Sequence, residues 1–69
     1  MLFRSLGLAL LRAKRFKRAL PYFEAARVEF DVLGLPHELA FTSQNIGQCL
    51  LGLGEADLAD KAFQNAERL

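Results

Sequence analysis

Residues 47–54 read GQCLLGLG, and this stretch decides between a nucleotide-binding loop and a helical repeat. Gly47 and Gly52 have the spacing of the two glycines in a phosphate-binding loop, GxxxxGK followed by Ser or Thr. Such a loop needs a lysine for the phosphate oxygens and a hydroxyl for magnesium directly after the second glycine, where this chain has Leu53 and Gly54. The preceding residues also follow helical rather than strand spacing, so we expect a helix end and a turn here.

Apolar residues recur every three or four positions through most of the chain, and no segment alternates as a strand does. Gly34 suits a left-handed helix stop, and Pro36 suits the first turn of the helix that follows. The pattern predicts an all-α chain of two stacked antiparallel hairpins joined by short turns. The four expected helices cover about residues 2–13, 16–33, 37–52 and 56–68.

The chain aligns with itself at a shift of 40 residues. Seven apolar or small positions match in this register: Leu6 with Ile46, Gly7 with Gly47, Leu10 with Leu50, Leu11 with Leu51, Ala19 with Ala59, Phe23 with Phe63 and Ala26 with Ala66. We therefore expect one domain, residues 1–69, built from one hairpin used twice, at about residues 2–35 and 36–69.

The repeated small residues predict how each hairpin packs. Mid-helix glycine costs ~1 kcal/mol relative to alanine, so a close approach of the partner helix must compensate at Gly7 and Gly47. Phe23 and Phe63 are expected to fill the space between hairpins.

The composition limits the classes of function. A chain of 69 residues, 52% of them hydrophobic, makes one small domain and is too apolar for a disordered tail. With Cys49 as the only cysteine and His37 as the only histidine, there is no internal disulfide and almost no material for a metal site. No catalytic triad, Cys/His pair or paired carboxylates can be identified, so we expect no enzyme activity and no cofactor. No apolar run approaches the ~20 residues of a membrane span, and the cysteine usage fits a reducing compartment, so we expect a cytoplasmic protein.

Charge is distributed unevenly, although the formal net charge is only +1. Residues 1–23 carry six basic side chains and no acidic one, whereas residues 24–69 carry three basic and eight acidic side chains. Residues 1–20 are compatible with a mitochondrial presequence, but their internal counterpart favours a role in the fold.

The basic patch consists of Arg12, Lys14, Arg15, Lys17 and Arg18. It is either solvated surface or a site for an acidic partner, such as residues 55–60 (EADLAD) of a neighbouring copy; nucleic acid or anionic lipid is a less favoured alternative.

At the repeated positions the chain resembles the tetratricopeptide repeat family, whose signature runs aromatic, Leu-Gly, aromatic or Leu, then Ala, Phe or Tyr, Ala. The first unit supplies Phe3, Leu6, Gly7, Leu10, Phe16, Ala19, Phe23 and Ala26, and the second supplies Ile46, Gly47, Leu50, Gly54, Ala59, Phe63 and Ala66. Three positions depart from the signature: Ser43 and Ala56 replace aromatic residues, and Lys14 replaces the turn glycine. The period is about six residues longer than the usual ~34, with the surplus in residues 28–36.

The resemblance implies a non-enzymatic module for protein–protein interaction. In this family the first helices of the units line a concave face that holds a peptide or helix. Carried over by register, the groove positions are Arg4, Ser5, Leu8 and Arg12 in the first unit and Phe41, Gln44, Asn45 and Gln48 in the second. Some members clamp a C-terminal carboxylate, for which Arg4 and Asn45 are suitable, but Leu8 stands where an Asn is expected. Ordinary solvated surface is the alternative, and Phe41 fits it least because an aromatic off the core stripe needs cover.

Two repeats are fewer than the three or so that stability usually requires. With no capping helix after Leu69, we expect the last helix to show Phe63 and Ala66 to water. The chain is therefore expected to be part of a longer array or a homo-oligomer joined through its uncapped ends. Two classes of function stay open: a module that binds a peptide or helix of a partner, and a structural segment whose partner is itself.

Overall fold

The computed structural model describes residues 2–68, which form four α-helices and no strand. They are α1 (Leu2–Arg12), α2 (Phe16–Leu33), α3 (Pro36–Gly52) and α4 (Ala56–Arg68). The predicted all-α architecture is confirmed, and the helix limits differ from the prediction by one residue, at the end of α1 and the start of α3. Met1 and Leu69, which the predicted domain includes, lie outside the described residues.

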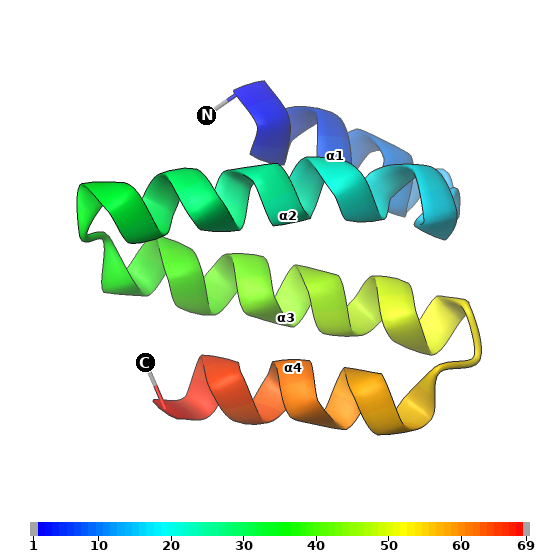
Figure 1. The fold of residues 1–69 in the computed structure, drawn as a ribbon. Helices are drawn as coiled ribbons and strands as arrows, with labels where there is room; N and C mark the ends of the chain where they lie inside the picture. Colours follow the sequence, from blue (N-terminus) through cyan, green and yellow to red (C-terminus); the bar gives the residue numbers. More distant parts are fainter. Residues whose placement is uncertain (1, 69) are drawn as a thin grey trace.

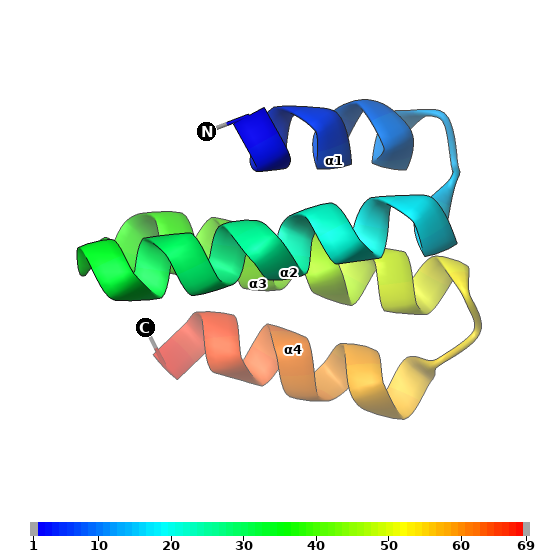
Figure 2. The ribbon, with the colours of Figure 1, turned by 45° about the horizontal axis from the view of Figure 1, so that its top comes forward.

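Each helix packs on its neighbours along the chain. Figure 1 shows α2, α3 and α4 side by side in antiparallel order, and Figure 2 shows α1 running along α2. Within residues 2–68, α1 meets α3 at only a few positions, and neither α1 nor α2 contacts α4. The α1–α2 and α3–α4 hairpins are therefore joined mainly through α2 and α3, and α1 and α4 each keep an uncovered side.

All three turns close with the same hydrogen-bonded cap. In each turn one residue takes a left-handed backbone: Lys14 (φ 60°), Gly34 (φ 68°) and Gly54 (φ 81°). The N–H of the next residue donates to the carbonyl oxygen five residues earlier: Arg15 to Leu10 at 2.8 Å, Leu35 to Phe30 at 3.0 Å, and Glu55 to Leu50 at 2.8 Å. This is the Schellman cap, which glycine normally completes without steric cost. Lys14 stands where the repeat signature has a glycine and forms the same cap, although its left-handed backbone is strained for a residue with a side chain.

A phenylalanine ring covers one glycine in the first helix of each hairpin. A Cβ on Gly7 would lie 2.8 Å from the Phe23 ring, and a Cβ on Gly47 would lie 2.6 Å from the Phe63 ring. The two contacts are related by the 40-residue shift found in the sequence. Phe23 also joins the buried cluster of Ala19, Ile46 and Cys49, as expected for a ring between hairpins. Phe63 packs on Gly47 of its own hairpin, and no further hairpin follows it within residues 2–68, so the expectation for this ring stays a prediction.

A third glycine joins the two hairpins. Gly52 is the last residue of α3, and a Cβ there would overlap the ring of Phe16 at the start of α2. The sequence predicted this glycine only as a helix end. Its missing side chain also leaves the space into which Phe16 packs.

The outward side of α4 is less apolar than predicted. Ala66 is only 7% exposed and Phe63 is half-buried. The expectation that both would face water is wrong for Ala66, because α4 turns this residue toward α3, the only helix it contacts within the described chain. No helix in residues 2–68 is both long and apolar enough to cross a bilayer.

Candidate interaction site

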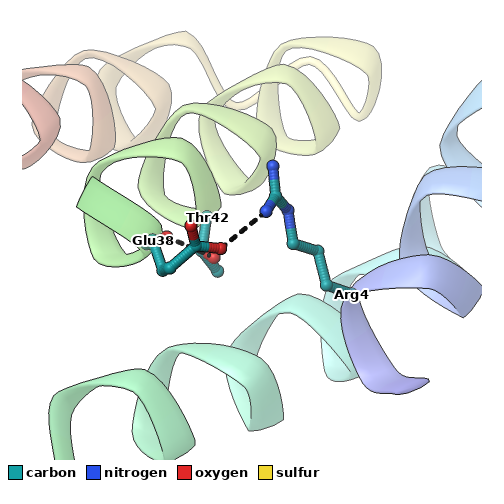
Figure 3. Close-up of polar contacts among 3 residues, drawn as sticks. All are labelled: Arg4, Glu38 and Thr42. Carbon is teal, nitrogen blue, oxygen red and sulfur yellow. Dashed lines mark hydrogen bonds and ion pairs between the residues drawn. The ribbon is translucent and has the colours of Figure 1, made fainter. Parts of the chain in front are cut away.

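Arg4 links the two hairpins on the side where α1 faces α3. Its Nη1 donates to the Glu38 carboxylate at 2.8 Å, as Figure 3 shows, and its guanidinium carbon lies 5.4 Å from the centre of the Phe41 ring. The buried Thr42 hydroxyl donates to the Glu38 carbonyl oxygen at 2.8 Å, which fixes the first turns of α3. Since α1 and α3 otherwise scarcely meet, this ion pair and cation–π contact are the main polar link between them.

One nitrogen of the Arg4 side chain is buried without a hydrogen-bond partner. Its Nε is buried and has no acceptor, while Nη1 is paired with Glu38. The Arg4 and Glu38 side chains remain 28% and 34% exposed, so water weakens their attraction, and a pair of this kind stabilises a fold by at most ~1 kcal/mol. An unpaired buried donor costs about 1–3 kcal/mol, and an acceptor from a binding partner reaches Nε only if the Arg4 side chain moves.

A depression of about 630 Å³ lies beside this contact. Its lining residues are Arg4, Ser5, Leu8, Leu35 and Glu38. Three of them are predicted groove positions on α1, and the other two come from the α2–α3 turn and the first turn of α3. The sequence did not predict two of these lining residues. Leu35 lies in a turn, outside the helical positions that were aligned with the repeat family. Glu38 could have been found only from its charge, which is opposite to that of Arg4.

None of the predicted groove positions on α3 lines this depression. Phe41 is 53% exposed, and the Arg4 guanidinium carbon lies over its ring. Gln44 and Gln48 are exposed and Asn45 is half-buried, one and two turns further along α3. Arg12 is exposed at the far end of α1, away from the depression.

The basic patch lies at the opposite end of α1 from the Arg4 contact. All five of its residues are exposed. Four of them surround a second depression, of about 300 Å³, whose lining is Lys14, Arg15, Phe16, Lys17, Arg18 and Leu53. No carboxylate lines this depression, so it presents positive charge around an apolar floor.

Cys49 has no catalytic surroundings. Its side chain is buried in the core cluster, and burial raises the pKa of the thiol. A buried thiol with a raised pKa is a poor nucleophile. In the part of the chain that the structure describes, no group of three or more His, Cys, Asp or Glu could hold a metal ion.

Comparison with known proteins finds no family model, no curated protein and no solved structure that matches this chain. The resemblance to tetratricopeptide repeats therefore rests on the residues given above and stays a prediction.

Proposed function

We propose that this chain is a non-enzymatic interaction module that holds a peptide or helix of a partner protein along α1 and α3. The observation that carries the proposal is the depression lined by Arg4, Leu8 and Leu35, with the exposed Phe41 beside it. The resemblance to tetratricopeptide repeats adds support, because that family uses the same side of its first helices for binding. The exposed Phe41 ring, with the Arg4 guanidinium carbon 5.4 Å from its centre, supports this proposal over ordinary solvated surface.

The chemistry of the site favours a guest with an apolar side chain and a neutral backbone. Leu8, Leu35 and Phe41 offer apolar contact, and the partly exposed Arg4 guanidinium can donate to a peptide carbonyl oxygen. The amides of Gln44 and Gln48 extend polar pairing along α3, since each can both donate and accept.

A carboxylate clamp is less well supported than carbonyl recognition. Glu38 already pairs with the Arg4 guanidinium, and its own negative charge would repel a second carboxylate. Because the paired charges cancel locally, we expect peptide binding to depend only weakly on salt. Binding of nucleic acid or anionic lipid through the basic patch would instead fall steeply with salt.

The experiment is a selection of random peptides on the immobilised chain, followed by affinity measurements on the peptides that bind. Phe41→Ala is expected to weaken binding at least ~10-fold, because a buried aromatic anchor typically carries 1–2 kcal/mol or more. Adding Arg4→Ala is expected to weaken it further. Val32→Ala is the matched control, since Val32 is an exposed apolar residue on α2, outside the site.

Backbone chemical shifts in the complex give a second readout. Shifts are expected at Ser5, Leu8, Phe41 and Gln44. An unchanged affinity for Phe41→Ala, or shifts confined to α2 and α4, would contradict the proposal.

A further inference from the structure

We infer that a second copy of this chain stacks head-to-tail on α4 and packs its α1 there in the register that α3 uses on α2. The free side of α4 is the only place where the repeat can continue beyond the second hairpin, because α4 contacts α3 alone within the described residues. This surface is separate from the peptide site, so the inference does not depend on the proposed function.

The register follows from the internal repeat. Across the α2–α3 interface, the Phe16 ring packs on Gly52, and Ala19 and Phe23 share a buried cluster with Ile46 and Cys49. A shift of 40 residues carries these positions onto α4 and onto α1 of the second copy. It pairs Ala56 with Arg12 of the second copy, and Ala59 and Phe63 with Leu6 and Ala9 of the second copy.

Side-chain sizes are complementary at the shifted positions. Inside the chain a large residue of α2, Phe16, meets a glycine of α3. In the proposed contact the order is reversed, because the exposed Ala56 is small and Arg12 is long. Leu6 is 41% exposed and Ala9 is exposed on α1, so both are free to cover the half-buried Phe63 ring.

Charge complementarity identifies the occupant as a second copy. Glu55 and Asp57 flank Ala56, and all three are exposed. Asp60 is also exposed and stands 40 residues after Leu20, which packs against the core cluster. An acidic rim of this kind suits a basic helix end, and residues 1–23 of the second copy bring Arg12 without any acidic side chain.

In this register only one residue of the basic patch takes part in the proposed contact. Because α2 and α4 do not contact one another within the described chain, α2 of the second copy has no contact with α4 of the first. Arg12 lies on α1 and enters the contact, whereas Lys17 and Arg18 lie on α2 and stay outside it. Arg18→Glu is therefore a control with the same change in charge.

The test is sedimentation of the whole chain over a range of concentrations at ~0.15 M salt, where the ~8 Å Debye length limits the influence of remote charges. Each copy added to an open head-to-tail assembly leaves a free α4 for the next, so the mean mass of the wild type should rise with concentration beyond that of a dimer. Arg12→Glu is expected to weaken association at least ~10-fold by placing like charges together. Arg18→Glu should change it less than about threefold.

Two further variants complete the test, and the first of them keeps it decisive if Arg12→Glu disturbs folding. Ala56→Trp fills the space for Arg12 at the exposed first residue of α4 and should block association while circular dichroism stays unchanged. A triple variant, Arg12→Glu with Glu55→Lys and Asp57→Lys, should restore association because it exchanges the charges on both sides. A strictly monomeric wild type, equal effects of Arg12→Glu and Arg18→Glu, or no rescue by the triple variant would overturn the inference.

Discussion

At the scale of single residues, Lys14 is the clearest case of a side chain in conflict with its backbone. It holds φ at 60° in a cap that the other two turns complete with glycine. A left-handed backbone costs an L-residue roughly 1–2 kcal/mol, part of which glycine loses again through its greater freedom in the unfolded chain. We therefore predict that Lys14→Gly raises the free energy of unfolding by about 1 kcal/mol, measured by urea denaturation.

Two variants serve as controls for this prediction. Lys14→Ala should leave stability nearly unchanged, since it removes the charge and keeps the strained Cβ. Gly54→Lys should destabilise the second turn by a similar ~1 kcal/mol, because it creates there the strain that Lys14 carries. A decrease in stability for Lys14→Gly would show that the lysine contributes more through its charge than it loses through its conformation.

At the scale of helices, the two phenylalanine–glycine contacts are alike in geometry and different in their freedom to relax. Replacing either helical glycine by alanine gains ~1 kcal/mol of helix propensity, whereas overpacking typically costs 1–3 kcal/mol. Phe23 is 0% exposed and cannot move away from a new methyl group at Gly7, but the half-buried Phe63 can move outward. We predict that Gly7→Ala lowers the free energy of unfolding by about 1–2 kcal/mol and that Gly47→Ala changes it by less than ~0.5 kcal/mol, both from urea denaturation.

A double variant tests the cause. Phe23→Leu combined with Gly7→Ala should cost less than the two single changes added together, because the smaller side chain leaves room for the methyl group. Equal losses for Gly7→Ala and Gly47→Ala would contradict the argument from burial.

The helices were predictable from sequence because glycine, proline and apolar spacing mark them locally. Gly34 and Pro36 fix a helix end and the next helix start within three residues, and the structure agrees to within one residue. The ring that covers each glycine was not predictable, since it depends on the rotation of one helix against another. The same holds for the candidate site. The repeat register predicted Arg4 and Leu8. The contact of Arg4 with Glu38 was not predictable, because it joins two hairpins and no local sequence pattern gives the distance between them.

At the scale of the whole molecule, the two central helices hold the structure together. Among the described residues, α2 and α3 each pack on two neighbours, while α1 and α4 each depend mainly on one. Elements with fewer buried contacts open at lower free energy. We predict that amide hydrogens of α1 and α4 exchange at least ~10-fold faster than those of α2 and α3 in dilute solution, measured by NMR.

Concentration gives the control for hydrogen exchange. If copies stack through α1 and α4, protection of these two helices should rise with protein concentration, and protection of α2 and α3 should change much less. Equal protection of all four helices at every concentration would show that the chain opens only as one unit, and the ranking by contacts would then be wrong.

Packing restricted largely to neighbouring helices also has a consequence for the speed of folding. Every extensive interface joins segments that follow one another in the chain, so few contacts require the closure of a long loop. Chains with such local contacts fold in microseconds to milliseconds, because little entropy is lost before each contact forms. The packing of each helix mainly on its chain neighbours, which leaves one side of α1 and of α4 uncovered, should therefore also make folding fast.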